Sequence, residues 1–446
     1  MTGIEQFGYR EQLRRALTTR DLVIYGMIFM VPIAPYAVFG FVWIDAKGMV
    51  PLAYFLGLVG MFFTAMSYAA MSRAFPIAGS VYTYAQRGLH EIAGFFSGWL
   101  ILLDYILVPA LLYIVSAVAL KPLLPGVPEW VWLAGFIAFN AVVNLIGIQF
   151  TARVNKYMLA MELLTLVLFV SCAMWALYHG KGAGGLTLKP VYDPGAFSFT
   201  TVAGATSIAV LSFLGFDGIS TLSEESRGGI DAIGRATLIA LLLVGGLFML
   251  QTWIATDLAR GMQFSSPGTA FYEISERAGG SWLRLATITA TVLASGVANA
   301  MVAQAAVSRI LFAMARDGKL PAALAKIHPR FQTPYVSTLI VSGVSLGVGL
   351  FFADHLDDLS RIVNFGALTG FLLLHLSVVN HFFIRAKSRD WLRHLLCPAA
   401  GFAVIAYVLY EMDAAAKIMG GCWIAIGVVY YLVLTFLVKK PVRLEI

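Results

Sequence analysis

The chain carries little charge for its length. Only 12% of its 446 residues are Asp, Glu, Lys or Arg, whereas 59% are hydrophobic, and the mean hydropathy is +0.81. A soluble protein carries about 25% charged residues. The composition therefore excludes a soluble globular protein and predicts an all-α membrane protein that crosses the lipid bilayer many times.

Cysteine is also scarce, and cofactor motifs are absent from the sequence. Cys172, Cys397 and Cys422 are scattered, so they indicate neither a metal cluster nor a disulfide framework. The chain has no phosphate-binding glycine loop, no zinc-ligand spacing and no nucleophile–base constellation. We therefore expect no cofactor, no metal, and no direct use of ATP.

Twelve apolar spans follow one another along the chain. An even number puts both termini on one side, and most of the 31 Lys and Arg residues lie in the tails and loops of that side. Because positive loops stay in the cytoplasm, we expect an inner-membrane protein with both termini cytoplasmic. The net charge of +7 then reflects orientation and not a nucleic-acid partner. No small-residue cleavage site follows the first span, so we expect that span to be retained. The predicted spans are residues 22–44, 51–72, 92–120, 130–148, 156–178, 200–224, 234–256, 281–314, 335–353, 361–384, 397–411 and 419–438.

The first span is interrupted by two prolines. Pro32 and Pro35 fall near its middle, where each removes a backbone N–H and clashes with the carbonyl four residues earlier. Irregular backbone persists in hydrocarbon only where it is buried in protein or lines a wet cavity. This pattern predicts two half-helices that meet at a site; the alternative is a proline kink without a ligand.

The sixth span has a matching interruption. Gly215, Asp217 and Gly218 cluster in mid-span, where helix propensity is weakest. Breaks five spans apart predict two five-helix repeats of inverted topology, with substrate and coupling ion at the paired breaks. The expected units are a tail (1–21), the two repeats (22–178 and 200–384), two appended helices (397–438) and a second tail (439–446).

Three acidic residues lie inside apolar spans: Asp104, Glu162 and Asp217. A charge at a helix centre costs about 2.5–3.5 kcal/mol on insertion scales, so such a residue usually has a partner or a task. Glu162 has no basic neighbour after Lys156 and is a candidate proton carrier, or else a structural hydrogen-bonding group. Asp217 could face a cationic ligand or carry a proton, or could cap the second half-helix. For Asp104, a packing or hydrogen-bonding pair with Tyr105 is the simpler interpretation.

Glu224 and Glu225 close the sixth span, where they form a candidate gate or a solvated helix end. Among the aromatic residues, Tyr36 and Phe216 lie near the breaks and could close over a ligand; ordinary membrane packing is the alternative. The complete set of candidate substrate-binding residues is Pro32, Ile33, Ala34, Tyr36, Tyr105, Phe213, Phe216 and Asp217.

Several motifs resemble the amino acid–polyamine–organocation superfamily over nearly the whole chain. They are residues 75–86 (FPIAGSVYTYAQ), 215–225 (GFDGISTLSEE), 308–321 (SRILFAMARDGKLP) and 328–334 (HPRFQTP). Within the superfamily, residues 97–105 (SGWLILLDY), 292–296 (VLASG) and 364–368 (NFGAL) look most like the bacterial putrescine importers. The resemblance implies a transporter with broken first and sixth helices.

Departures from the family pattern bear on the substrate. Amino-acid carriers of this superfamily usually place Gly-x-Gly in the first break to hold the substrate carboxylate; here Pro32, Ile33 and Ala34 stand there. Pro32 has no N–H to give, which favours an amine without a carboxylate. Putrescine importers carry an acidic residue where this chain has Ala37, which argues against putrescine itself. A family lysine aligns with Glu162, which could carry a proton or bind an amine or cation directly.

The sequence is thus interpreted as a secondary active importer of a small amine or polyamine, coupled to protons. An amino-acid importer or exchanger with a modified carboxylate site is the alternative. A membrane-embedded enzyme would need a polar catalytic cluster, and a sensor or scaffold would more naturally carry a soluble domain; neither feature is found.

Overall fold

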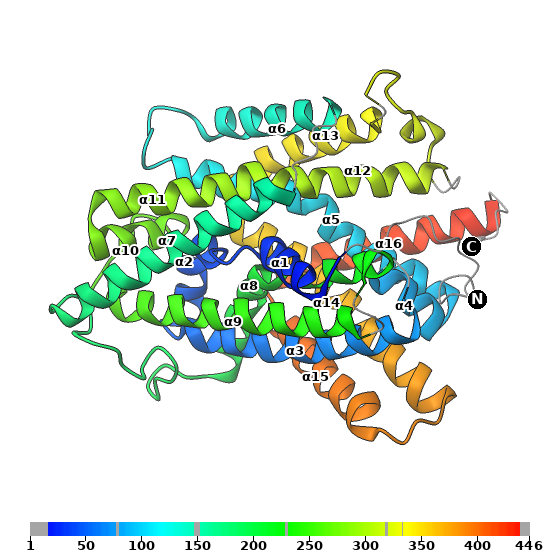
Figure 1. Ribbon diagram of the computed structural model, residues 1–446, viewed down its shortest axis with the longest axis horizontal. Helices are drawn as coiled ribbons and strands as arrows, with labels where there is room; N and C mark the ends of the chain where they lie inside the picture. Colours follow the sequence, from blue (N-terminus) through cyan, green and yellow to red (C-terminus); the bar gives the residue numbers. More distant parts are fainter. Residues whose placement is uncertain are drawn as a thin grey trace.

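The computed structural model describes residues 17–76, 80–146, 152–227, 231–316, 320–331 and 333–437, and over these ranges the protein is an elongated bundle of helices (Figure 1). Apart from an isolated bridge between Leu17 and Ser226, the described residues form no strand. The α-helices are α1 (Thr19–Met30), α2 (Pro35–Asp45), α3 (Val50–Ala74), α4 (Ser80–Gly88), α5 (Glu91–Leu120), α6 (Glu129–Ile146), α7 (Ala152–Tyr178), α8 (Phe199–Ala209), α9 (Ala232–Ala259), α10 (Ala270–Gly279), α11 (Ser281–Thr291), α12 (Ala300–Arg316), α13 (Tyr335–Phe351), α14 (Leu356–Val378), α15 (Cys397–Glu411) and α16 (Ala414–Leu432). Shorter 3-10 segments are η2 (Val210–Phe213), η3 (Phe216–Glu225), η4 (Pro267–Thr269) and η6 (Ala322–Ala325), and π-helical segments are η5 (Val292–Asn299), η7 (Val379–Arg385), η8 (Leu392–Leu396) and η9 (Val433–Leu437).

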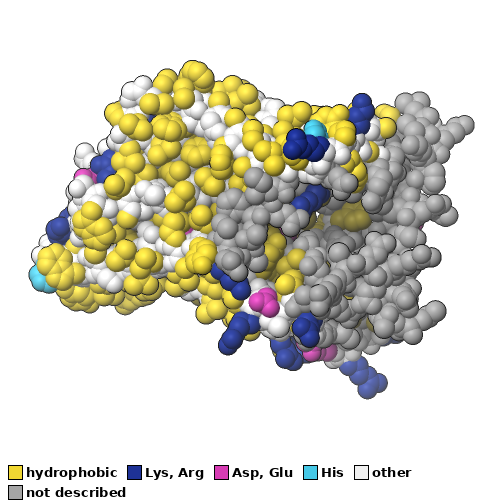
Figure 2. Space-filling view, turned by 45° about the horizontal axis from the view of Figure 1, so that its top comes forward, with side chains coloured by type: hydrophobic (Ala, Val, Ile, Leu, Met, Phe, Trp, Pro, Cys, Tyr) yellow, Lys and Arg dark blue, Asp and Glu magenta, His cyan; other side chains and the backbone are white. Residues whose placement is uncertain are grey.

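The helices have the length and apolarity of a multi-pass membrane protein. Within the described ranges, nine are long and apolar enough to cross a membrane, or up to eleven if each of two bent pairs is one span. Helix α13 is apolar but has only 17 residues. Hydrophobic side chains cover most of the described face in Figure 2, with Lys and Arg mainly toward one end. Helices therefore occupy the predicted apolar spans, and the number of crossings stays a prediction.

The first predicted break is confirmed. Helices α1 and α2 meet at an angle of 57°. Pro32 has no N–H for the carbonyl of Ile28, and Val31 adopts φ 51°, a conformation strained for a β-branched residue. Pro35 then occupies the first position of α2, where its missing N–H costs nothing. The chain therefore stops one helix and starts another within four residues.

The second break is also confirmed and lies beside the first. The segments Phe199–Phe213 and Phe216–Ser223 are bent by 42°, and Gly215 between them has φ 108°. A Cβ at Gly215 would come within 2.9 Å of the carbonyl oxygen of Phe29 in α1. Only glycine fits here, because it tolerates both the left-handed backbone and the close approach.

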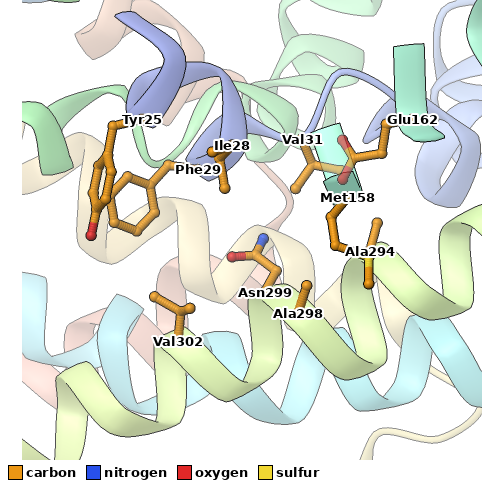
Figure 3. Close-up of a pocket in the computed structure, with 10 residues that line it drawn as sticks. All are labelled: Tyr25, Ile28, Phe29, Val31, Met158, Glu162, Ala294, Ala298, Asn299 and Val302. Atoms are coloured by element: carbon orange, nitrogen blue, oxygen red, sulfur yellow. The ribbon is translucent and has the colours of Figure 1, made fainter. Parts of the chain in front are cut away.

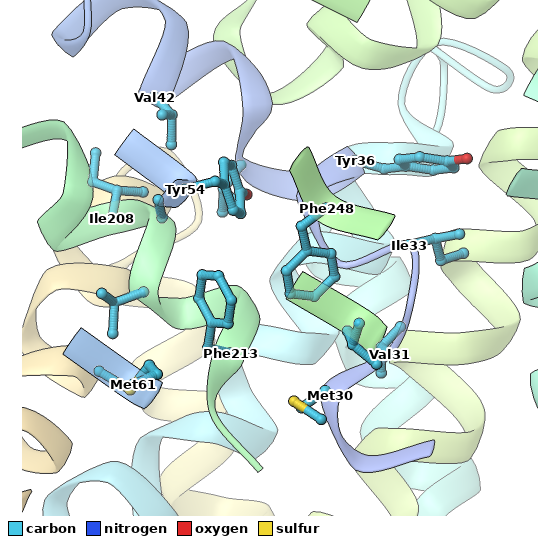
Figure 4. Packing of buried hydrophobic residues seen from close by; sticks show 14 of the residues in the cluster. Met30, Val31, Ile33, Tyr36, Val42, Tyr54, Met61, Ile208, Phe213 and Phe248 are labelled. Carbon is cyan, nitrogen blue, oxygen red and sulfur yellow. The ribbon is translucent and has the colours of Figure 1, made fainter. Parts of the chain in front are cut away.

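Aromatic residues from α3, α9 and η2 pack together beside the two breaks (Figure 4). Phe248 packs edge-on against Phe213, with ring centroids 5.2 Å apart, and against Tyr54 at 5.8 Å. The Tyr54 hydroxyl shares a 2.9 Å hydrogen bond with Ser212. Because lipid tails are as apolar as these rings, the cluster contributes through close van der Waals packing, and it links η2 to α3 and α9.

Helix α12 is joined to α11 through the π-helical segment η5, which the sequence did not predict. The wider turn leaves the Gly296 carbonyl accessible, and the side chain of Asn140 on α6 donates a 2.7 Å hydrogen bond to it. Such π-segments occur frequently at functional sites. Here the irregular turn lies opposite the first break.

Helix α15 docks by close packing and helix α16 by hydrogen bonds. His375 on α14 bonds Ser67 on α3 at 2.9 Å, and Gly401 on α15 leaves no room for a side chain beside the His375 ring. On α16, the indole of Trp423 donates to the Trp99 carbonyl while the Trp99 indole donates back to Trp423. These contacts fix α15 and α16 against α3, α5 and α14.

Replacement of Gly40 by Ala should destabilise the protein. A Cβ at this position in α2 would overlap the carbonyl oxygen of Pro267 and the methyl group of Ala270, and overpacking costs about 1–3 kcal/mol. Gly343→Ala is the matched control in α13, because nothing lies within 4 Å of its added Cβ. In a thermal-unfolding assay of purified protein, Gly40→Ala should lower Tm while Gly343→Ala preserves or raises it. Equal Tm values would contradict this account of the α2 packing.

Candidate functional site

A small cavity lies between the first break, α7 and the π-helical segment (Figure 3). Its volume of about 20 Å³ is sufficient for roughly one water molecule. The cavity thus suits a proton or a water molecule and is too small for an amine in this conformation. Its lining residues are Tyr25, Ile28, Phe29, Val31, Met158, Glu162, Ala294, Ala298, Asn299 and Val302.

Glu162 on α7 is the one acidic residue in this lining, which contains no Lys, Arg or His. Its side chain is 4% exposed, and its Oε2 atom is buried without a hydrogen-bond partner in the described part of the chain. Figure 3 shows the carboxyl group directed toward Val31 at the first break. A buried carboxylate without a partner is strongly disfavoured, so the site favours a bound proton or the arrival of a cation.

Asp217 lies at the start of η3 and caps the second break. Its Oδ1 accepts a hydrogen bond from the backbone N–H of Gly215 at 3.3 Å, and the side chain is buried. The capping alternative weighed from the sequence therefore describes at least part of its role. The carboxyl group also interacts with the backbone N–H groups of Asp217 and Gly218, and its two oxygens keep some further acceptor capacity.

Asp104 and Tyr105 on α5 lie near Asp217. Asp104 interacts electrostatically with Asp217, and so does Tyr105. The Oδ1 atom of Asp104 is buried and unpaired within the described residues. Because two neighbouring carboxyl groups disfavour double ionisation, this second acidic region is also suited to a proton or cation. It does not include Glu162.

The predicted aromatic residues divide between the two regions. Tyr36 stacks on Phe271 with centroids 3.9 Å apart, and its hydroxyl, which is buried and unpaired within the described chain, interacts electrostatically with Glu162. Phe216 packs against Tyr68 beside Asp217. Phe213 belongs to the aromatic cluster that it forms with Tyr54 and Phe248. None of these three rings lines the small cavity.

The remaining candidates form the first break and the end of η3. Ile33 is buried and Ala34 half-buried, while the Pro32 carbonyl accepts a hydrogen bond from Gln251 on α9. Glu224 and Glu225 occupy the last turn of η3, and their side chains lie outside the described part of the structure.

Sequence reasoning missed Asn299, Tyr25 and Gln251. Asn299 and Gln251 are isolated amides inside apolar spans, a signal as visible as the three acids, since an amide in hydrocarbon also needs partners. Tyr25 carried no such signal, because an aromatic residue near the end of a span is ordinary.

A larger cavity of about 760 Å³ lies among the ends of α5, α6 and α14 together with α10. It is lined by ion pairs, including Lys121–Glu129 at 2.5 Å and Arg284–Glu276 at 2.6 Å. The Glu129 carboxylate raises the pKa of the Lys121 ammonium group. Charges in this cavity, which we call the vestibule, therefore pair with each other. None of its lining residues belongs to either break.

Sequence comparison identifies relatives over nearly the whole chain. The family model described as amino acid permease matches residues 28–438. The chain is 31% identical to the low-affinity putrescine importer PlaP of Escherichia coli, over 97% of this chain and 96% of that protein. It is 26% identical to the branched-chain amino acid permease BcaP of Bacillus subtilis, over 94% and 93% respectively. It is also 24% identical to a methylthioribose transporter of Bacillus subtilis, over 94% and 93%.

The two buried acids at the breaks should respond differently to neutral replacement. Asp217→Ala leaves the Gly215 N–H unsatisfied, which costs about 1–3 kcal/mol, so Tm should fall. Asp217→Asn keeps an acceptor oxygen and should restore most of the loss. Glu162→Gln removes no described hydrogen bond and should leave Tm unchanged. Thermal unfolding of the three variants measures this, and an equal fall for Asp217→Ala and Asp217→Asn would rule out the cap.

Proposed function

Because the chain belongs to the amino acid permease family, whose members are transporters and not enzymes, we propose that it is a secondary active importer of a small amine or polyamine, coupled to protons. The single observation that carries the proposal is the unpaired, buried Glu162 carboxyl group beside the first break. Its location would be the cell inner membrane.

The proposed architecture has twelve membrane spans. Helices α1 to α7 form the first five-span repeat (22–178), the segments from α8 to η7 form the second (200–384), and α15 and α16 are the appended pair (397–438). Support comes from the paired breaks five spans apart, an arrangement typical of inverted-repeat transporters. The Lys and Arg distribution supports the proposed cytoplasmic position of both termini.

In the proposed coupling mechanism, Glu162 carries the proton. When the cavity is dry, the carboxyl group is neutral, because no basic group faces it there and a lone buried charge is costly. When water enters from one side, hydration stabilises the carboxylate and the proton leaves. Repetition of this exchange on alternate sides would link proton flow to substrate movement. The Tyr36 hydroxyl is buried without a partner in the described part of the chain, which makes Tyr36 a candidate partner for the protonated carboxyl group.

Proposed substrate recognition uses the two breaks and the second acidic region. Pro32 contributes no N–H, so the usual capture of a substrate carboxylate at this position is weakened. Carbonyl groups at the end of α1 carry partial negative charge, which suits an ammonium group. Asp217, with Phe216 and Tyr105 beside it, would bind that ammonium group, and Ile33 and Ala34 would contact the apolar part of the substrate.

Glu224 and Glu225 are proposed as gate residues because of their position at the end of η3. Glu224 and Glu225 end η3, the second half of the sixth span, and would close the cytoplasmic side. Closure would require the segments around the breaks to rotate, and discontinuous helices provide the hinges for such movement.

Amino-acid import or exchange is the second candidate. It is favoured by the similarity to the branched-chain amino acid permease BcaP over most of both chains. In that case the backbone N–H groups at the second break would hold the substrate carboxylate, because Pro32 has no N–H to offer.

Glu162→Gln should abolish proton-driven accumulation, because glutamine keeps the size of the side chain and cannot exchange a proton. We expect an at least tenfold loss of putrescine uptake into proteoliposomes with an imposed pH gradient. Putrescine binding, measured by thermal shift, should survive if Glu162 serves coupling alone.

The control is Glu273→Gln on α10, since Glu273 accepts hydrogen bonds from Ser265 and Thr269 in the vestibule and faces neither break. This variant should respond to the gradient like the parent protein. A Glu162→Gln variant that also responds fully to the gradient would refute proton coupling through Glu162.

The ligand class can be tested with matched pairs. Putrescine and leucine methyl ester should stabilise the purified protein against heat at least as well as leucine does, because the site as proposed recognises the amine more than the carboxylate. Should leucine stabilise while the ester and putrescine do not, the amino-acid alternative is correct.

A further inference from the structure

Gln251 connects α9 to the first break. Its side chain is fully buried, and its Nε2 donates to the Pro32 carbonyl oxygen at 2.9 Å and to the Leu247 carbonyl within α9 at 3.0 Å. Both amide hydrogens are therefore used on backbone carbonyl groups. The Oε1 atom is buried without a partner among the described residues, so the side chain is held in place by donation alone.

The break itself explains why the Pro32 carbonyl needs this partner. In a helix it would accept from the N–H three or four residues later. Pro35 has no N–H, and the N–H of Tyr36 bonds to the Ile33 carbonyl instead at 3.0 Å. A buried carbonyl without a partner is destabilising, and nearly all such groups in native proteins are satisfied. Gln251 supplies the bond that is lost because Pro35 has no N–H and the Tyr36 N–H bonds to Ile33.

Helix α9 also supports the second break. Phe248, three residues before Gln251, packs against Phe213 at 5.2 Å, and Phe213 lies two residues before Gly215. One face of α9 therefore contacts both interruptions, with a hydrogen bond at the first and an aromatic contact at the second. The side chain that holds the break backbone lies on a long, continuous helix, which is suitable for positioning irregular segments.

We propose that Gln251 is a positioning residue, which fixes the unwound backbone at Pro32 and thereby the placement of Ala34 and of Val31 next to Glu162. The inference rests on the proposed function, because it takes the first break as the substrate and coupling site. Loss of the amide would allow the backbone at the first break to shift. The side chain of Gln251 would therefore affect ligand binding through the position of this backbone, without touching the ligand.

The test compares Gln251→Leu with Gln304→Leu. Gln304 on α12 is also fully buried and also loses two hydrogen bonds, to Asn144 and Ser342 at 2.7 Å each, and it contacts neither break. Both variants are made with Ala34→Cys in a background in which Cys172, Cys397 and Cys422 are replaced by Ser. The first readout is the rate of N-ethylmaleimide labelling at position 34, and the second is the dissociation constant for putrescine.

Gln251→Leu should change the labelling rate at least fivefold and weaken putrescine binding about tenfold, the scale of one buried hydrogen bond. Gln304→Leu should leave both within twofold although its Tm also falls. If Gln251→Leu does not fold, Gln251→Asn replaces it, since its shorter amide reaches Pro32 poorly and should shift labelling in the same direction.

A labelling rate equal to the parent in the Gln251 variant, or equal changes in the Gln251 and Gln304 variants, would overturn the proposal. The labelling readout needs no substrate. Failure of the parent protein to bind both putrescine and leucine methyl ester would therefore refute the proposed substrate class and leave the positioning role testable.

Discussion

Unsatisfied backbone groups in an apolar environment are the constraint on which the rest of this structure depends. A helix in hydrocarbon satisfies its own N–H and carbonyl groups, and any interruption exposes several of them. Pro32, Pro35 and Gly215 interrupt two helices near one another. Side chains supply the partners that the backbone has lost: Asp217, two residues along the same span, accepts from Gly215, and Gln251 on the neighbouring helix α9 donates to Pro32.

Buried amides repeat this pattern elsewhere in the bundle. Asn140 donates to Gly296 in the π-helical segment, and Asn364 donates to Ser207 in α8 at 2.7 Å, a few residues before the second break. In each case an NH₂ group on a regular helix binds a carbonyl oxygen on or near an irregular one. Amides suit this task because they donate hydrogen bonds without bringing a charge into the membrane.

The acids serve a different physical purpose. Glu162 and Asp104 each keep a buried oxygen atom without a hydrogen-bond partner in the described chain, which a purely structural role would not require. They occupy separate regions, Glu162 by the first break and Asp104 near Asp217. A transporter that handles both a proton and a cationic amine has use for two such regions, because one carboxyl group cannot hold both ligands at once.

The sequence by itself determined the class of the protein, where its long apolar helices lie and both interruptions, whereas α4 (Ser80–Gly88) and α10 (Ala270–Gly279) lie outside the predicted spans. These properties depend on composition and on local backbone chemistry: charge is excluded from hydrocarbon, and proline and glycine act within a few residues of themselves. The Glu162 candidate also came from the sequence, since an acid in an apolar run is visible without neighbours. The cap of Asp217 on Gly215 spans only two residues and was already one alternative at the level of the sequence. Only the tertiary structure decided that Tyr36 lies on the Glu162 side while Phe216 lies on the Asp217 side, and that Gln251 reaches Pro32. The Gln251–Pro32 contact joins residues 219 positions apart, and the packing of whole helices, which no local pattern encodes, brings them together.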